Sequence, residues 1–142
     1  MRMNGFLFSV IYDKHVKKKE IPGKKGEHMT AVKDKIWMKD SEADNFEAAE
    51  GVIRRIKSYT DELMVVENIF RKGAVGSVHS HPHTQITYVV SGKFEFTING
   101  ETRTVTAGDT MLKKNGIPHG CVCLEDGILL DIFSPMREDF VN

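Results

Sequence analysis

Three histidines and one glutamine have the residue types and the spacing of a metal site. His79 and His81 are two residues apart, so on a β-strand both imidazole rings project from the same face and can share one ion. Gln85 keeps the same parity after Pro82, and His119 begins a second expected strand that a hairpin can bring opposite the first pair. We therefore predict that one divalent transition metal ion binds to His79, His81, Gln85 and His119.

The donor set favours Ni, Zn, Fe, Co, Mn or Cu over Mg or Ca, and the sequence does not distinguish among the six metals. All four predicted ligands are neutral, so the ion keeps its full positive charge and attracts an anionic ligand. A purely structural zinc site is disfavoured because such sites usually contain cysteine. A single His-x-His pair on a strand is usually a surface pair or a hydrogen-bonded core pair, and it is the four residues together that favour a metal. His83 has the same parity, but Pro82 and Thr84 indicate a turn there, whereas His15 and His28 show no ligand pattern.

The C-terminal segment supplies a second group of candidate functional residues. Asp131 interrupts the apolar strand Ile128–Phe133, and a carboxylate in such a strand favours a functional group that faces a cavity. Phe133 shares the face of Asp131, and Arg137 follows just past the end of the strand. These three residues would give the pocket an acid or base, an aromatic wall and a carboxylate-binding guanidinium. The alternative is that Asp131 pairs with Arg137 only to close the mouth of the barrel.

The elements that would position these residues are short β-strands. The pattern from residue 51 onward predicts strands at Val52–Tyr59, Leu63–Phe70, Gln85–Val90, Lys93–Ile98, Glu101–Thr106, Thr110–Lys113, His119–Leu124 and Ile128–Phe133. The turn signals between them are Ser91-Gly92, Asn99-Gly100, Gly108-Asp109 and Asp126-Gly127. No stretch keeps the hydrophobic period of an α-helix for long enough to favour a helix over these strands. The fold class is therefore all-β, an antiparallel sandwich or barrel in which the jelly-roll type is a leading option.

Length and composition limit the possible functions. The 142 residues fit one domain, and the 20 basic and 20 acidic residues cancel, so no global charge recruits nucleic acid or an anionic membrane. The apolar run Phe6–Tyr12 is too short to span a membrane and lacks the flanks of a signal peptide, so we expect a cytoplasmic protein. Cys121 and Cys123 are two residues apart on one strand, which disfavours a disulfide.

The chain divides near residue 50 into an N-terminal extension (1–50) and a barrel (51–142). We predict that Phe6–Tyr12 forms a strand that adds to the partner subunit of a homodimer. The lysine-rich run Lys14–Lys25 could be a nucleic-acid-binding arm, but acidic residues follow it, so a solvated linker is the preferred interpretation.

Two segments resemble the motifs of the cupin superfamily, G-x5-H-x-H-x3-4-E-x6-G and G-x5-P-x-G-x2-H-x3-N. The first motif matches from Gly73 to Gly92, with Gln85 in place of the glutamate. The second matches at Gly108, Gly116 and His119, while Lys114 replaces the proline and Cys123 the final asparagine. The resemblance spans roughly residues 50–135 and implies a single-domain, jelly-roll cupin barrel.

Three longer stretches narrow the resemblance. The runs HSHPHTQITYVVSGKFEF, PHGCVCLEDG and DIFSPMREDF are similar to the KdgF-like cupins of pectin and alginate breakdown. This resemblance implies an enzyme that converts 4,5-unsaturated uronate monosaccharides into linear 4-deoxy-5-ketouronates, with a small anionic sugar as its substrate. It places the metal on His79, His81, Gln85 and His119, and the functional residues at Asp131, Phe133 and Arg137. The alternatives are a metal-dependent cupin dioxygenase and a non-catalytic cupin that binds a sugar or a metal.

Overall fold

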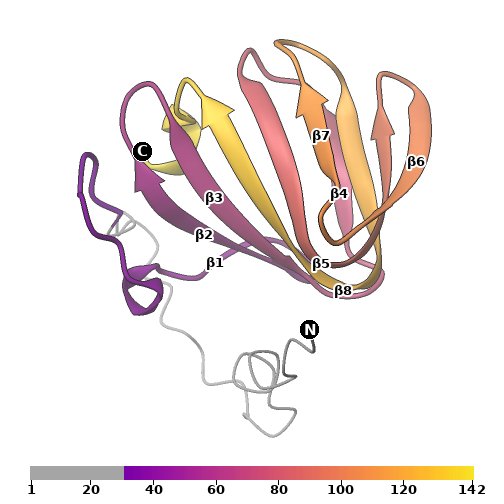
Figure 1. The fold of residues 1–142 in the computed structure, drawn as a ribbon, viewed down its shortest axis with the longest axis horizontal. Helices are drawn as coiled ribbons and strands as arrows, with labels where there is room; N and C mark the ends of the chain where they lie inside the picture. Colours follow the sequence, from indigo (N-terminus) through magenta and orange to yellow (C-terminus); the bar gives the residue numbers. More distant parts are fainter. Residues whose placement is uncertain (1–30) are drawn as a thin grey trace, which may run out of the picture.

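The structure, a computed structural model, describes residues 31–142 and contains eight antiparallel strands and two short 3-10 helices (Figure 1). The elements are η1 (Asp40–Glu42), β1 (Phe46–Ala49), β2 (Val52–Tyr59), β3 (Met64–Phe70), β4 (Val75–His79), β5 (Thr84–Ile98), β6 (Glu101–Thr106), β7 (Thr110–Lys113), β8 (His119–Ser134) and η2 (Glu138–Phe140). The all-β prediction is confirmed, and the bounds of β2, β6 and β7 agree with the predicted bounds. The pattern did not predict β1 as a strand.

Two of the four predicted turns are absent from the described part of the chain. The strands predicted at Gln85–Val90 and Lys93–Ile98 are one continuous strand, β5, and those predicted at His119–Leu124 and Ile128–Phe133 are one strand, β8. Ser91-Gly92 and Asp126-Gly127 therefore do not form hairpin turns, and the prediction was wrong at both places. Asn99-Gly100 does connect two strands, β5 and β6.

The two long strands bend together where the turns were predicted. Gly92 of β5 has a φ of 85°, and a Cβ atom added to it would lie only 2.6 Å from the carbonyl oxygen of Asp126 in β8. The pairing of β5 with β8 shifts its register between Val89 and Phe94. Glycine is required here because the backbone is in the left-handed region and a neighbouring backbone approaches closely.

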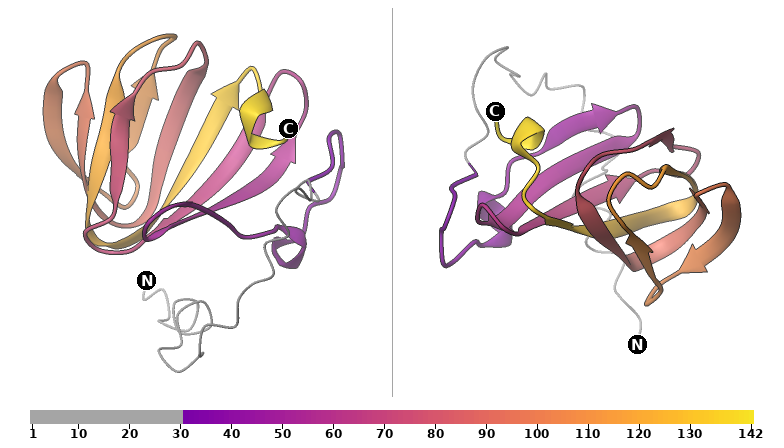
Figure 2. Two further views of the ribbon diagram at one scale, coloured as in Figure 1. Left: turned by 180° about the vertical axis from the view of Figure 1, so that it is seen from behind. Right: turned by 90° about the horizontal axis from the view of Figure 1, so that it is seen from above.

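The bend divides the sheet into two halves that share β5 and β8. In one half, neighbouring strands follow the order β1, β2, β3, the C-terminal part of β8, the N-terminal part of β5, and β7. In the other half, the order is β4, the N-terminal part of β8, the C-terminal part of β5, and β6. Figures 1 and 2 show the curved sheet that results.

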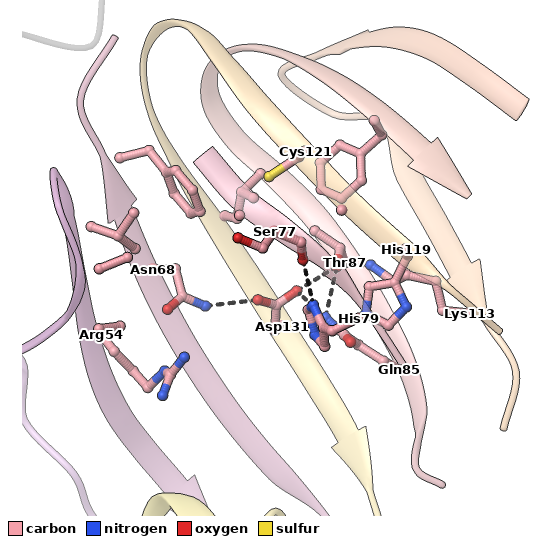
Figure 3. A pocket seen from close by; sticks show the side chains of 18 of the residues that line it. Arg54, Asn68, Ser77, His79, Gln85, Thr87, Lys113, His119, Cys121 and Asp131 are labelled. Carbon is pink, nitrogen blue, oxygen red and sulfur yellow. Dashed lines mark hydrogen bonds between the residues drawn. The ribbon is translucent and has the colours of Figure 1, made fainter. Parts of the chain in front are cut away.

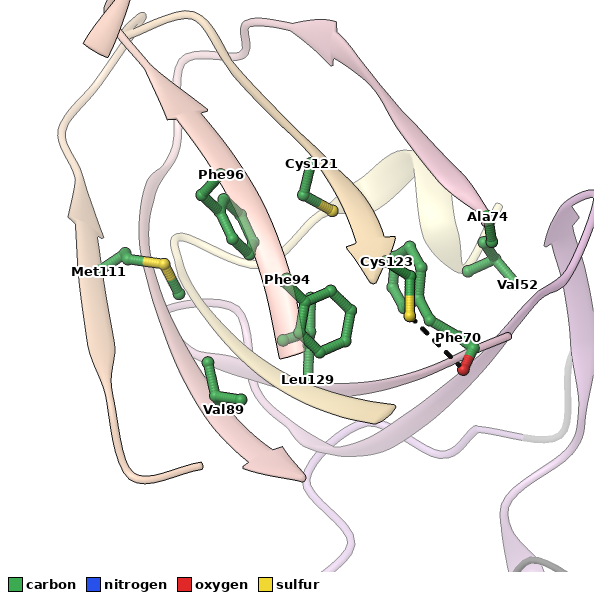
Figure 4. Packing of buried hydrophobic residues seen from close by; sticks show 10 residues of the cluster. All are labelled: Val52, Phe70, Ala74, Val89, Phe94, Phe96, Met111, Cys121, Cys123 and Leu129. Carbon is green, nitrogen blue, oxygen red and sulfur yellow. Dashed lines mark hydrogen bonds between the residues drawn. The ribbon is translucent and has the colours of Figure 1, made fainter. Parts of the chain in front are cut away.

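The hydrophobic core draws residues from both halves (Figure 4). Phe70 of β3 and Phe94 of β5 pack edge to face, with ring centres 5.4 Å apart. Cys121 and Cys123 are buried free thiols, so the prediction that they form no disulfide is confirmed. Burial raises the pKa of Cys121 to about 12 and that of Cys123 to about 11.

The C-terminal helix η2 lies beside β2, where Phe140 packs near Ile56 and Phe133 (Figure 2). No helix within residues 31–142 is long and apolar enough to cross a membrane. The predicted strand Phe6–Tyr12, the lysine-rich run and His15 and His28 lie outside the described residues.

Candidate metal centre and pocket

Three of the four predicted metal ligands form one cluster of imidazole rings. His79 ends β4 and His119 begins β8, and the two residues pair directly across the strands, with ring centres 4.6 Å apart. The ring of His81 lies 5.6 Å from that of His79 and 5.0 Å from that of His119. One ring nitrogen from each histidine lies within 4.8 Å of the others, which is compatible with a shared metal ion.

His81 reaches this cluster from a loop. The sequence predicted His79 and His81 on one strand, but β4 ends at His79 and His81 lies in the connection to β5. Pro82 follows immediately and cannot donate a backbone hydrogen bond to a sheet, which explains why the strand ends before it. The ring centre of His83 lies 5.3 Å from that of His81, but His83 does not belong to the cluster of candidate ligand atoms.

The ring nitrogens of two histidines are arranged as in a metal site. Nδ1 of His79 lies 2.7 Å from the carbonyl oxygen of Ser77, and Nδ1 of His119 lies 2.8 Å from that of Ile117. A nitrogen beside a carbonyl oxygen must donate its proton, so Nε2 of each neutral ring is left as an acceptor. Nε2 of His119 is buried and has no hydrogen-bond partner among the described residues. Desolvation lowers the pKa of His119 to about 4, so its ring stays neutral, as metal ligation requires.

Gln85 presents an amide oxygen to the same cluster. The residue is buried on β5, and its Nε2 donates a hydrogen bond of 2.8 Å to Oδ1 of Asp131. Its Oε1 lies 3.0 Å from Nε2 of His81. Because an ionised carboxylate only accepts hydrogen bonds, Asp131 fixes which end of the amide faces the histidines. The residues present therefore fit a metal with three imidazole nitrogens and one amide oxygen.

Asp131 is the centre of a buried hydrogen-bond network. Its Oδ1 accepts hydrogen bonds from Gln85 and from the hydroxyl of Thr87, and its Oδ2 accepts one of 2.7 Å from Nδ2 of Asn68. Asp131 forms no ion pair with Arg137, so the alternative that the two only close the barrel mouth is wrong. Arg137 instead pairs with Asp139 through two hydrogen bonds, of 2.9 and 2.8 Å.

Phe133 and Arg137 lie beside this network. Phe133 is buried, and its ring centre is 5.7 Å from that of His81. Cζ of Arg137 lies 5.3 Å from the centre of the Phe133 ring. A cavity of about 340 Å³ is lined by His79, Gln85, His119, Asp131, Phe133 and Arg137, among others. Every predicted site residue except His81 thus faces the same cavity.

Five further polar residues line the cavity, and the sequence analysis missed all of them: Arg54, Asn68, Ser77, Thr87 and Lys113 (Figure 3). Each occupies an inward position of its strand, so strict alternation along the strands was the signal that could have found them. Lys113 is fully buried, and its ammonium donates a hydrogen bond to the hydroxyl of Thr87. Desolvation lowers the pKa of Lys113, and the charge of Asp131 opposes that effect.

Comparison with known proteins agrees with this architecture. Residues 67–133 match the cupin domain family. The chain is 43% identical over 104 residues to the pectin degradation protein KdgF of Dickeya dadantii, which covers 72% of this chain and 94% of that protein.

Two solved structures are similar to most of the chain. An RmlC-like cupin from Shewanella frigidimarina has a TM-score of 0.73 and 39% identity, over 75% of this chain and 96% of the other. KdgF from Halomonas sp. has a TM-score of 0.71 and 39% identity, over 74% and 97% of the two chains. This protein is therefore a cupin and belongs to the family of the pectin degradation protein KdgF.

Proposed function

We propose that this protein opens 4,5-unsaturated uronate monosaccharides to linear 4-deoxy-5-ketouronates, using one divalent transition metal ion on His79, His81, Gln85 and His119. The observation that carries the proposal is that one cavity combines three of the four candidate metal ligands, His79, Gln85 and His119, with a buried carboxylate and a guanidinium. The similarity to KdgF proteins supports the same substrate class. The cavity volume is at the lower end of the range of small-molecule sites, which suits a monosaccharide.

The proposed reaction is an isomerisation that needs proton transfers and no redox step. The proton leaves the hydroxyl at C1, the bond between C1 and the ring oxygen breaks, and its electron pair stays on that oxygen as an enol or enolate. A proton then adds to C4, which leaves a ketone at C5 and an aldehyde at C1. The metal, when bound, would supply a Lewis acid whose charge is not reduced by any anionic ligand.

Asp131 is the proposed carrier of the proton. Its carboxylate is buried at the cavity wall, and the hydrogen bonds from Asn68 and Gln85 hold it in one orientation. A carboxylate in this position can accept the proton from the C1 hydroxyl and return it to C4. Because no other carboxylate lines the cavity within residues 31–142, Asp131 is the side chain assigned to both transfers.

Arg137 and Phe133 are the proposed substrate-positioning residues. Arg137 pairs with Asp139 through Nε and one terminal nitrogen, which leaves its other terminal nitrogen for the substrate carboxylate. Phe133 offers an apolar surface against which a sugar ring can pack. The homodimer and the cytoplasmic location stay predictions from the sequence.

The test is incubation of the metal-loaded protein with unsaturated galacturonate or mannuronate released by a polysaccharide lyase. We expect the absorbance of the double bond to disappear faster with protein than without it, and NMR to show the linear ketouronate. A chelator should abolish the acceleration, and added divalent metal should restore it. Equal rates with and without protein would refute the proposal; uptake of O₂ would indicate a dioxygenase, and tight binding without turnover a binding protein.

A further inference from the structure

Arg54 is a charged residue on the inner face of the sheet. It lies on β2 between the buried residues Val52 and Ile56, and it pairs across the strands with Asn68 of β3. It lines the same cavity as Asp131 and the histidines, and Figure 3 shows its guanidinium on the side of Asn68 that faces away from the histidines. A cation placed here by the alternation of a strand faces the ligand space and not the bulk solvent.

The charge of Arg54 has no counter-ion within residues 31–142. It forms no ion pair there, and its Nε atom is buried without a hydrogen-bond partner. The neighbouring Arg55 faces the other side of the sheet and is paired with Asp40 and Glu67, each at 2.8 Å. Burial and the charge of Arg137 both lower the pKa of Arg54, and the charges of Asp131 and Asp139 oppose them only in part, so the charged form is destabilised in this position. An anion in the cavity would relieve both effects.

Phe140 brings the two guanidinium groups close together. Cζ of Arg54 lies 3.9 Å from the centre of the Phe140 ring, and Cζ of Arg137 lies 4.2 Å from the same centre. The two guanidinium carbons are therefore separated by no more than the sum of these distances. In a forked ion pair a carboxylate carbon lies roughly 4 Å from the guanidinium carbon, so a bridging carboxylate requires two guanidinium carbons no more than about 8 Å apart, and this pair meets that limit.

We propose that Arg54 is a second carboxylate-binding residue of the cavity, which holds the carboxylate of a sugar acid together with Arg137. The assignment of the carboxylate to a uronate rests on the proposed function. Arg137 is already paired with Asp139, whereas Arg54 forms no ion pair within residues 31–142. The pair therefore selects an anionic sugar over its neutral counterpart, and Arg54 supplies the larger part of that selectivity.

The test measures the binding of a saturated, unreactive sugar acid to the metal-loaded protein by isothermal titration calorimetry. D-galacturonate is the anionic probe and D-galactose is the neutral one. We expect Arg54→Gln to weaken the binding of galacturonate by about 10- to 100-fold and to leave the binding of galactose unchanged. Arg54→Lys should give a smaller loss, because an ammonium keeps the charge without the fork.

Arg55→Gln is the matched control, since it removes the same charge from the next residue of β2 on the opposite face of the sheet. It should lower the unfolding midpoint and leave the affinity for galacturonate unchanged. With unsaturated galacturonate as substrate, Arg54→Gln should raise KM by a similar factor and change kcat by less than about threefold, as expected for a contact that is equally strong in the ground and transition states.

Three results would overturn the proposal: no binding of millimolar galacturonate by the unsubstituted protein, equal losses for galacturonate and galactose, or an unchanged affinity in both Arg54 variants. If Arg54→Gln does not fold, Arg54→Lys alone decides. Binding of galacturonate that depends on Arg54, without turnover of the unsaturated sugar, would leave this proposal intact and refute the ring-opening reaction. Turnover of the unsaturated sugar with the same KM in the Arg54 variants would support the ring-opening reaction and refute this proposal.

Discussion

Replacing Asp131 by asparagine separates the role of its charge from that of its shape. Asp131 accepts three side-chain hydrogen bonds, from Asn68, Gln85 and Thr87, and asparagine has nearly the same size. The asparagine oxygen can still accept from Gln85, and the amide of Asn68 can turn to accept from the new NH₂ group. We therefore expect the orientation of Gln85, and with it the metal content, to persist in Asp131→Asn.

The expected loss in activity is much larger than the expected loss in stability. Three charge-assisted hydrogen bonds become neutral ones, which costs about 1 kcal/mol each, but the variant no longer buries the charge of Asp131, so the net change in stability is small, roughly 1 kcal/mol. The loss of a general acid and base lowers the rate by about 10² to 10⁴, or roughly 3 to 5 kcal/mol in the activation free energy.

The assay measures kcat from the loss of double-bond absorbance, together with metal stoichiometry and the unfolding midpoint of each variant. Asn68→Leu is the control, because it removes one hydrogen bond to Oδ2 of Asp131 and keeps the carboxylate. Its activity should fall far less than that of Asp131→Asn. Activity of Asp131→Asn within about tenfold of the unsubstituted protein would refute the role of Asp131 as the proton carrier.

Three further predictions concern stability and reactivity. In the metal-free protein, the pKa of His119 is about 4 in the folded state against 6.5 for the free side chain, so the unfolded state binds more protons between these two pH values. The unfolding midpoint should therefore fall as the pH drops from about 6.5 toward 4. A midpoint that is constant over this range would contradict the lowered pKa of His119. Gly92→Val should destabilise the fold by at least about 2 kcal/mol in urea titrations, and by more than the control Gly108→Ala, which also has a positive φ but has nothing within 4 Å of its added Cβ. Cys121 and Cys123 should react with iodoacetamide slowly at neutral pH and rapidly in urea, since burial raises both thiol pKa values; fast labelling of the folded protein would show that they are accessible.

The histidine cluster could be predicted from the sequence because its determinants are local. The spacing of His79 and His81 and the turn residues before His119 are readable within short segments, and the resulting cluster contains all three histidines. The strand assignment of His81 was wrong because the effect of Pro82 on the preceding residues was underestimated.

The bend in the long strands could not be predicted in the same way. Ser91-Gly92 and Asp126-Gly127 both have the composition of a hairpin turn, and only their contact with each other, across 33 residues of intervening chain, makes them a shared bend. The polar residues of the cavity were missed for a related reason. Arg54 and Lys113 are inward-facing only once their strands are paired with β3 and β5, and those pairings are non-local.

The position of β8 after its partner strands in the sequence determines the order in which the site can assemble. This strand carries His119 and Asp131, and it pairs with β3, β4 and β5. During synthesis, the chain up to residue 118 therefore has two of the clustered histidines and lacks the carboxylate of Asp131. Contacts such as that between Asn68 and Asp131 close loops of more than sixty residues, and such non-local contacts form slowly. Metal binding and the complete cavity would thus both require β8, and a chain that lacks β8 would bind the metal weakly.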